Sequence, residues 1–510
     1  MFFTIFEGLL AEENFDLVVI GGGPAGYAGA MRALDFKKRV LLVESKRIGG
    51  AGVYDGVLSS KTLWEYSMKV AAIREMIPNF SVKFEEVRKV VRESLYERKT
   101  QMTVHLRLLE KSLGSKLFHY EKGKGKLLDS HTVEISKSDG STRIVKAGHI
   151  LICTGSRPRL LPQIPSDEHV IMTSDGIKNI DNFPESLVIL GAGVIGCEFA
   201  TIFSNLGKTK VFMIDKADRI LPFEDEDISN TVTGNLEKNG VTIHHNAQLS
   251  SMRLENGKKV CYELVFKDGK KETLSVEKAL IAVGRIPNLE NLNLESAGVR
   301  MTDRGYISHN DTQTSISNIY AAGDVTGSIA LVSIAEREAR HAIVRMFGKA
   351  IKPIQYQNIS TIMFLNPEVA AVGMSEQDAR AKGIPIKVVK LDFSTNARAI
   401  AMRKTKGFFK ILVTADNGMK ILGMRAVGEH ASTAIQAVAY LVHTQQGIHE
   451  LADMIHPHPS IIEGIQECLR MLLGKSIYKP AVFKDKLQCY LCENGVCTPI
   501  NSLSDPESHG

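Results

Sequence analysis

The sequence predicts an α/β protein in which one strand–helix–strand unit occurs twice and an α+β domain follows. The first observation is an apolar run at residues 15–20 that leads directly into a glycine-rich segment at residues 21–26. The second is that residues 187–190 and 191–196 repeat this pattern. Short apolar runs bounded by glycine are typical of parallel strands that are buried on both faces.

Composition and charge exclude several classes of protein. A net charge of +6, from 63 basic and 57 acidic residues, is small for 510 residues and gives no reason to expect a nucleic-acid partner. No apolar stretch approaches the roughly 20 residues of a membrane span. The N-terminus lacks the basic region and cleavage site of a signal peptide, and the seven scattered cysteines do not resemble a secreted disulfide framework. We therefore expect a cytoplasmic protein.

The first glycine-rich segment has the features of a dinucleotide cradle, as in a Rossmann-like domain. Gly21, Gly23 and Gly26 follow a predicted strand and open a predicted helix. A pyrophosphate needs backbone N–H groups at close range and a helix N-terminus, which side chains larger than glycine would block. Glu44 ends the next predicted strand, where a carboxylate can accept a hydrogen bond from a ribose hydroxyl. The alternative is a glycine-rich turn with no ligand.

The second segment repeats the cradle at Gly191, Gly193 and Gly196. Asp215 ends the following predicted strand, and an acid there accepts the 2′-OH of NAD and repels the 2′-phosphate of NADP. NAD is therefore favoured over NADP, although Lys216 and Arg219 lie nearby and could weaken that preference. Two such units suggest two dinucleotides, one of them a tightly held flavin, with hydride passing between them.

The rest of the chain is divided by composition and periodicity. Residues 62–115 carry helical periodicity with mixed charge, and residues 117–150 have the pattern of short strands. The predicted domains are residues 1–165 with 295–350, residues 166–294, residues 355–475, and a flexible cysteine-bearing tail at residues 476–510.

Further motifs accompany the two cradles. They are residues 153–158 with Gly155, residues 196–200 with Glu198, residues 282–288 with Gly284, and residues 319–324 with Asp324. Together these segments resemble the pyridine nucleotide-disulfide oxidoreductases, which include dihydrolipoamide dehydrogenase and soluble transhydrogenase, over residues 14–475. The resemblance implies that residues 1–165 with 295–350 bind FAD and that residues 166–294 bind NAD. It implies that residues 355–475 are the dimerisation domain of a homodimer. It also implies that Asp324 binds the ribityl chain of the flavin and that Glu198 lies near the nicotinamide.

Residues 49–61 depart from the family pattern. The usual signature carries two cysteines, and this chain has Gly52 and Val57 at those positions. Neither residue can form a thiolate, so ordinary dithiol–disulfide exchange is chemically unavailable there. Lys61 is retained, and the resemblance implies that it lies beside the flavin with Glu198 as its partner, where it can stabilise the reduced flavin. The alternatives are a surface lysine and a helix-start carboxylate.

Residues 455–463 resemble the acid–base segment of the family. The resemblance implies that His458 transfers a proton, that Glu463 orients it, and that both face the flavin of the other subunit. A histidine held by a carboxylate is a good general base for a thiol, but the thiol is missing here. The alternative is that the pair only holds an interface loop.

Cys489, Cys492 and Cys497 resemble, by position, the C-terminal redox tails of some relatives. Such a tail could accept electrons from flavin or bind a soft metal. Three cysteines without a fourth ligand do not make a closed zinc site, so no resident metal is predicted.

The sequence therefore predicts an FAD-dependent NAD(P)H oxidoreductase that resembles dihydrolipoamide dehydrogenase. It would pass hydride or electrons from nicotinamide through flavin directly to an unidentified acceptor, as a transhydrogenase or diaphorase does, without a redox disulfide. A second hypothesis is a dihydrolipoamide dehydrogenase paralogue kept as a non-catalytic structural or regulatory component of a 2-oxoacid dehydrogenase complex. Retention of His458 and Glu463 fits that second hypothesis better. A third, a dihydrolipoamide or metal-ion reductase that uses the tail cysteines, is the least favoured.

Overall fold

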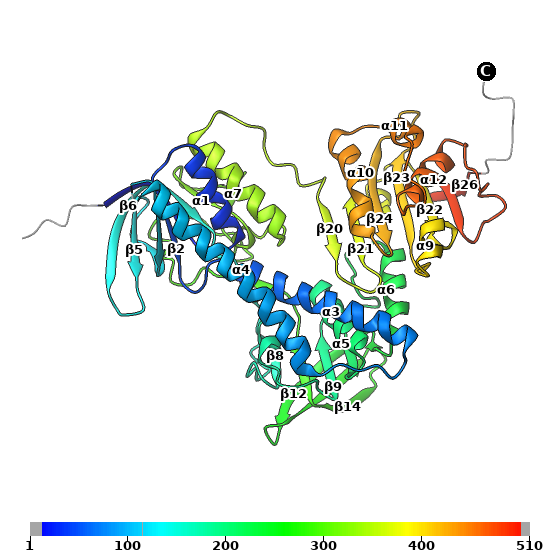
Figure 1. Ribbon diagram of the computed structural model, residues 1–510, viewed down its shortest axis with the longest axis horizontal. Coiled ribbons are helices and arrows are strands. Elements are labelled where there is room, and N and C mark those ends of the chain that lie inside the picture. The colour runs from blue at the N-terminus through cyan, green and yellow to red at the C-terminus, as the bar shows by residue number, and fades with distance from the viewer. Residues whose placement is uncertain (1–12, 115, 501–510) are drawn as a thin grey trace, which may run out of the picture. The chain divides into compact units, whose positions relative to one another are not determined.

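The computed structural model describes residues 13–114 and 116–500, which form two compact units (Figure 1). Unit 1 comprises the described parts of Met1–Leu63, Lys83–Leu160 and Val283–Ile354. Unit 2 comprises those of Trp64–Val82, Leu161–Ala282 and Gln355–Gly510. Most of the first predicted domain falls in unit 1, and most of the second and third predicted domains fall in unit 2.

A parallel sheet forms the centre of unit 1. β1 (Glu13–Ile20) lies between β2 (Val40–Glu44) and β6 (Thr142–Ile152), and both pairs are parallel. Leu17 and Val18 point to opposite faces of β1 and are both fully buried, as expected for a sheet covered on both faces. The strand order is β17-β18-β19-β6-β1-β2-β3, with β5 paired to β6 and β4 to β5, whereas β7 and β16 pair separately. The remaining strands of unit 1 are β3 (Phe118–Lys122), β4 (Lys124–Leu127), β5 (Thr132–Ser136), β7 (Ser156–Pro158), β16 (Arg285–Pro287), β17 (His309–Asn310), β18 (Gln313–Thr314) and β19 (Ile319–Ala321).

Helices α1 (Pro24–Asp35) and α7 (Val332–Phe347) lie side by side in unit 1 (Figure 1). Buried small residues such as Ala30 and Ala339 let the two helices approach closely. The helical stretch predicted at residues 62–115 forms two helices. They are separated at Pro78, which lacks the N–H needed to continue a helix. The first of these helices is α3 (Val57–Met76), which begins in unit 1 and continues into unit 2 from Trp64. The second is α4 (Phe84–Leu113), and the shorter elements of unit 1 are α2 (Gly50–Val53) and η2 (Asp324–Thr326).

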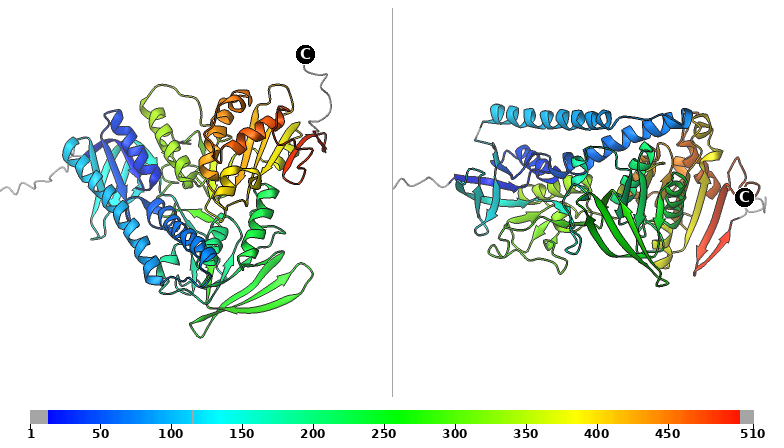
Figure 2. Two further views of the ribbon diagram at one scale, coloured as in Figure 1. Left: turned by 45° about the vertical axis from the view of Figure 1, so that its right-hand side comes forward. Right: turned by 90° about the horizontal axis from the view of Figure 1, so that it is seen from below.

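Unit 2 contains the second parallel sheet. β9 (Ser186–Leu190) lies between β10 (Lys210–Ile214) and β15 (Lys278–Ile281), again with parallel neighbours, which confirms the predicted duplication. A three-stranded antiparallel sheet, β12-β13-β14, is visible as the long green strands in Figure 2. The other elements are β8 (Ile171–Thr173), η1 (Gly176–Asn179), α5 (Val194–Leu206), α6 (Glu226–Lys238), β11 (Thr242–His244), β12 (Ala247–Glu255), β13 (Lys259–Phe266) and β14 (Lys271–Val276).

The C-terminal part of unit 2 is an antiparallel sheet of order β20-β21-β24-β23-β22-β25-β26. Helices α10 and α12 share one apolar core with one face of this sheet, whereas Ala379 of α8 packs on the opposite face. The elements are β20 (Ser360–Met363), β21 (Val369–Gly373), α8 (Glu376–Ala381), β22 (Ile386–Asp392), η3 (Phe393–Thr395), α9 (Ala397–Ala401), β23 (Phe408–Thr414), β24 (Ile421–Val427), α10 (Ala431–Thr444), α11 (His449–Asp453) and α12 (Glu463–Leu472).

The prediction of a flexible tail at residues 476–510 is wrong for much of residues 476–500, the part that the structure describes. β25 (Leu487–Glu493) pairs with β22, and β26 (Val496–Pro499) pairs with β25, so both strands extend the C-terminal sheet (red in Figure 2). The physical reason is that the free edge of β22 offers backbone hydrogen bonds to a further strand. Residues 501–510 lie outside the described residues.

Within residues 13–114 and 116–500, every helix is too short or too polar to traverse a lipid bilayer.

Candidate nucleotide-binding sites

The first cradle is a tight turn between β1 and α1. Gly21 has φ +107° and donates its N–H to Val43 O at 2.8 Å. A Cβ on Gly26 would lie 1.8 Å from Gly21 O, and a Cβ on Gly21 would lie 2.3 Å from Cys153 O. A Cβ on Gly23 would meet no protein atom within 4 Å. The turn therefore needs glycine at two positions for its own packing and leaves Gly23 open to an approaching group, which fits a pyrophosphate.

Glu44 holds this turn from the end of β2. Its Oε2 accepts the N–H of Gly22 at 2.7 Å, and its Oε1 accepts that of Lys46 at 2.6 Å. Each carboxylate oxygen has a second lone pair, so the side chain can still accept from a ribose hydroxyl. The geometry therefore suits the role predicted for Glu44.

In the sheet of unit 1, β6 lies between β1 and β19 and is parallel to both, so the C-terminal ends of the three strands meet at one edge of the sheet. There the hydroxyl of Ser156 donates to the carboxylate of Asp324. Glu338, which is buried on α7, accepts the N–H of Gly323 at 2.7 Å and so fixes the backbone that carries Asp324. The sequence places Ser156 within a motif but does not single out Ser156 or Glu338 as functional residues. The available signal for Glu338 was an acid at helical spacing among buried alanines.

Two further motif segments meet within unit 1. Arg285 donates to Ser156 Oγ and Ser156 O, both at 2.8 Å. Asn288 donates its side-chain amide to Thr154 O at 3.0 Å. These bonds, with the β7–β16 pair, hold residues 153–158 against residues 284–288. Gly155 and Gly284 both have positive φ, and a Cβ on either would meet no protein atom within 4 Å.

The second cradle, in unit 2, repeats the first. Gly191 has φ +103° and donates to Ile214 O at 3.0 Å, while a Cβ on Gly196 would lie 2.0 Å from Gly191 O. Gly193 again faces open space. Asp215 accepts the N–H of Ala192 at 2.9 Å and that of Ala217 at 2.8 Å, as Glu44 does in the first cradle. The two turns therefore share one hydrogen-bonding scheme as well as one glycine spacing.

Glu198 follows the second cradle on α5 and is buried. Its Oε1 accepts the N–H of Phe364 at 3.1 Å. The ring of Phe364 lies edge-on to Trp64, whose Nε1 donates to Leu365 O at 3.0 Å. Lys61 belongs to unit 1, so its pairing with Glu198 stays a prediction.

The segment of residues 49–61 forms α2 and the start of α3. A Cβ on Gly52 would lie 2.5 Å from Cγ of Pro24, the first residue of α1. Val57 is exposed. Cys153 is the single cysteine among the residues of unit 1, and burial raises the pKa of its thiol far above the ordinary value. The described part of unit 1 therefore holds no readily formed thiolate near its cradle.

His458 and Glu463 are paired as predicted. His458 Nδ1 lies 2.8 Å from Glu463 Oε1, and Glu463 Oε2 accepts the N–H of Ser460 at 2.6 Å. Burial acts to raise the pKa of Glu463, but these hydrogen bonds outweigh burial and hold the pKa below its ordinary value. The side chain of His458 is 71% exposed. The pair is therefore oriented and open on the surface of the described chain, and its part in proton transfer stays a prediction.

Two family profiles match the chain. The pyridine nucleotide-disulphide oxidoreductase profile matches residues 15–339, and the dimerisation-domain profile of the same group matches residues 359–469. The dihydrolipoyl dehydrogenase of Chlamydia muridarum is 31% identical over 483 residues, covering 93% of this chain and 100% of that protein. A dihydrolipoyl dehydrogenase of Bacillus subtilis is 30% identical over 482 residues, covering 91% of this chain and 99% of that protein.

Solved structures agree with these relatives. LpdA from Mycobacterium tuberculosis superposes with a TM-score of 0.82 at 29% identity, covering 90% of this chain and 99% of that one. The HOCl-induced flavoprotein disulfide reductase RclA from Escherichia coli gives a TM-score of 0.78 at 25% identity, covering 90% and 100%.

The fold and the two cradles define a flavoprotein oxidoreductase with two dinucleotide-binding domains and a C-terminal dimerisation domain. The chain belongs to the pyridine nucleotide-disulphide oxidoreductase family. Members of this family use FAD and NAD(H), the cofactors predicted from the two glycine-rich segments. The protein is accordingly an FAD-dependent NAD(P)H oxidoreductase.

We expect Asp215→Asn to reduce the discrimination between NADH and NADPH. The substitution removes the charge that repels a 2′-phosphate and weakens a charge-assisted hydrogen bond, so the ratio of the two dissociation constants should fall about tenfold or more. Fluorescence titration with each nucleotide measures the ratio. Asp218→Asn, at an exposed acid three residues further on, should leave it unchanged. An unchanged ratio in Asp215→Asn would contradict the role assigned to Asp215.

Proposed function

We propose that this oxidoreductase passes hydride or electrons from NAD(P)H through FAD directly to a second acceptor, in the manner of a transhydrogenase or diaphorase, without a redox disulfide. The observation that carries the proposal is the composition and packing of residues 49–61. The resemblance puts Gly52 and Val57 where relatives carry thiols, and a Cβ on Gly52 would lie so close to the ring of Pro24 that one of the two residues would have to shift. The local packing therefore suits glycine at this position.

In this proposal the cradle of unit 1 binds FAD and the cradle of unit 2 binds NAD(H). FAD, when bound, accepts a hydride and releases its electrons to the acceptor. Lys61 supplies a positive charge that stabilises the reduced flavin, and Glu198 positions Lys61. His458 and Glu463, contributed across a homodimer, hold a proton at His458 Nε2 for transfer to the acceptor. The FAD-binding residues are Gly21, Gly23, Gly26, Glu44, Lys61, Gly155, Gly284 and Asp324, and the NAD-binding residues are Gly191, Gly193, Gly196 and Asp215.

Lys61→Met should slow NADH oxidation about 100-fold, because loss of a preorganised charge at a developing anion typically has an effect of this size. The flavin content and the dissociation constant for NADH should change little. Lys69→Met is the matched control, since Lys69 lies exposed on the same helix. Stopped-flow absorbance of the flavin measures the rate. Equal rates for the two variants would remove Lys61 from the mechanism.

The proposal as a whole is tested with the purified full-length protein and a panel of acceptors. Anaerobic NADH should bleach the flavin band without producing a long-wavelength thiolate–flavin band. Turnover should then occur with thio-NADP or a quinone and stay at background with lipoamide. Reduction of lipoamide at a rate comparable to that with thio-NADP or a quinone would contradict the proposal that the reaction has no disulfide step. Full bleaching of the flavin with no turnover on any acceptor would instead support the second hypothesis, in which the protein is a non-catalytic component of a 2-oxoacid dehydrogenase complex.

A further inference from the structure

The hairpin β25–β26 carries a disulfide. Asn494 and Gly495 form its two-residue turn with φ of +51° and +79°, as a type I′ turn requires. This turn places Cys492 directly opposite Cys497, with their Cα atoms 4.1 Å apart, and the two sulfurs are bonded. The register of the hairpin therefore determines which two cysteines face each other.

The two sulfurs have different surroundings. Cys492 is buried in the apolar cluster between α8 and the sheet, whereas Cys497 is only half-buried near the free edge. Cys489 lies three residues before Cys492 on the same strand and so faces the other side of the sheet. Burial also raises the pKa of the Cys489 thiol to about 11. Cys489 is therefore excluded from pairing with either sulfur, and Cys497 is the one that an external thiolate can reach.

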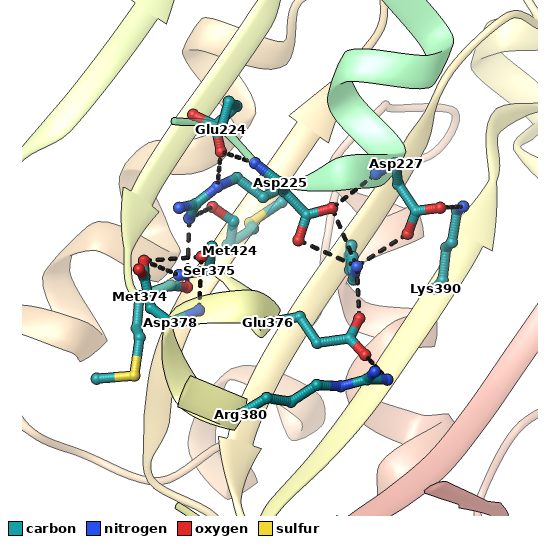
Figure 3. Close-up of polar contacts among 12 residues, drawn as sticks. Glu224, Asp225, Asp227, Met374, Ser375, Glu376, Asp378, Arg380, Lys390 and Met424 are labelled. Atoms are coloured by element: carbon teal, nitrogen blue, oxygen red, sulfur yellow. Dashed lines mark hydrogen bonds and ion pairs between the residues drawn. The ribbon is translucent and has the colours of Figure 1, made fainter. Parts of the chain in front are cut away.

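A guanidinium group lies against both bonded sulfurs. Arg380 Nη2 is 2.9 Å from Cys497 Sγ and 3.6 Å from Cys492 Sγ. Glu376 forms an ion pair with Arg380 one helical turn away (Figure 3). Glu376 is itself held by Lys410 Nζ at 2.6 Å and by the hydroxyl of Tyr490 at 2.8 Å. The positive charge beside the sulfurs is thus held by a chain of buried and half-buried partners.

The geometry points to a redox-active dithiol–disulfide site at Cys492 and Cys497, which exchanges two electrons with an external dithiol. A fixed cation beside a disulfide stabilises the thiolate that leaves when the bond breaks and so accelerates exchange. Glu376 and the two sulfurs also lie close enough to hold a metal ion together. The guanidinium occupies the same place, however, and a second cation there is disfavoured. Exchange is the chemistry that this arrangement favours, and it is independent of the proposed flavin reaction.

The exchange proceeds in two balanced steps. A thiolate of the external dithiol attacks Cys497 Sγ, the Cys492–Cys497 bond breaks, and Cys492 leaves as a thiolate beside Arg380. The second thiolate of the dithiol then attacks its own sulfur in the mixed disulfide and releases Cys497. The external dithiol is oxidised to a disulfide, the hairpin pair is reduced by two electrons, and the two protons of the dithiol pass through solvent to Cys492 and Cys497.

The test uses the full-length flavin-loaded protein in buffers of graded reduced and oxidised dithiothreitol. The samples are quenched with N-ethylmaleimide, and the labelled cysteines are read by peptide mass spectrometry. Cys492 and Cys497 should become labelled together in one two-electron transition, while Cys489 stays unlabelled. A pair that remains as two thiols in fully oxidised buffer would overturn the proposal. So would labelling of the two residues in separate transitions.

The role of the guanidinium is tested by kinetics. Arg380→Gln should slow reduction of the pair by dithiothreitol about tenfold at every pH, because the departing Cys492 thiolate loses the cation that stabilises it. Arg380→Lys should recover most of the rate. Lys382→Gln, at an exposed cation two residues further on, is the matched control. Unchanged rates in Arg380→Gln would overturn the assignment. A further arm adds a catalytic amount of a reduced CxxC redox protein. Faster reduction than with dithiothreitol alone indicates a protein dithiol as the natural source, and equal rates indicate a small-molecule dithiol.

Discussion

Gly26→Ala should yield a protein almost without flavin. The added Cβ would lie 1.8 Å from the carbonyl oxygen of Gly21, and because that atom belongs to the backbone no side-chain rotation can relieve the overlap. Gly21 is itself held at φ +107° by its hydrogen bond to Val43. The start of α1 must therefore move away from the turn, and the N–H groups that would hold a pyrophosphate lose their convergence. We expect the flavin content to fall at least about tenfold. The ratio of absorbance at 450 and 280 nm and chromatography of the released flavin measure it.

The reciprocal variant is Gly196→Ala. It creates the same overlap in the second cradle, where the added Cβ would lie 2.0 Å from Gly191 O. This variant should keep its flavin and lose tight binding of NADH, because the second cradle belongs to a different sheet. Together the two variants assign one dinucleotide to each cradle. Loss of flavin in Gly196→Ala with retention in Gly26→Ala would reverse that assignment.

Both cradles could be predicted from sequence because their geometry is local. The strand, the glycines, the helix and the acid that ends the next strand all lie within one βαβ unit, where chain connectivity fixes their arrangement. Glu44 and Asp215 accordingly hold the N–H groups of their own turns. The bond between Ser156 and Asp324 joins residues 168 positions apart. It depends on the order of strands in the sheet, which periodicity does not reveal.

The C-terminal hairpin was missed for a related reason. Asn494-Gly495 is a strong local signal for a two-residue hairpin turn, but the composition of the segment favoured a flexible tail. β25 is ordered by pairing with β22, about 100 residues earlier in the chain, and that edge is a tertiary feature. The cysteine spacing became meaningful only when the turn placed Cys492 opposite Cys497.

Substitution within a buried ion cluster of unit 2 should cause a large loss of stability. The side chain of Lys410 on β23 is only 2% exposed, and its Nζ lies 3.0 Å from both carboxylate oxygens of Asp225. It also lies 2.8 Å from Asp227 and 2.6 Å from Glu376. Figure 3 shows Asp225 and Asp227 at the start of α6 and Glu376 on α8 converging from two directions. One buried cation therefore contacts carboxylates from separate elements of the unit.

This cluster also predicts the acid sensitivity of unit 2. Burial acts to raise the pKa of Asp227 and of Glu376, but Lys410 and the other polar partners of each carboxyl together outweigh burial and hold both pKa values below their ordinary range. A carboxyl whose pKa is lower in the folded state adds stability above its unfolded-state pKa and loses it as pH falls through the folded-state value. Stability should therefore decline below about pH 4.

Lys410→Met should destabilise unit 2 by about 3–5 kcal/mol, because the methionine fills the space but leaves buried carboxylates without their cation. Urea unfolding followed by fluorescence of Trp64, the one tryptophan of the chain and a buried residue of unit 2, measures the loss. Lys390→Met is the matched control: Lys390 pairs with Asp227 at 2.7 Å but is more exposed, so the loss should stay below about 1 kcal/mol. The loss in Lys410→Met should also shrink at acid pH, where the carboxyl groups become neutral. Equal losses in the two variants, or a loss in Lys410→Met that is independent of pH, would show that the cluster contributes packing rather than charge compensation.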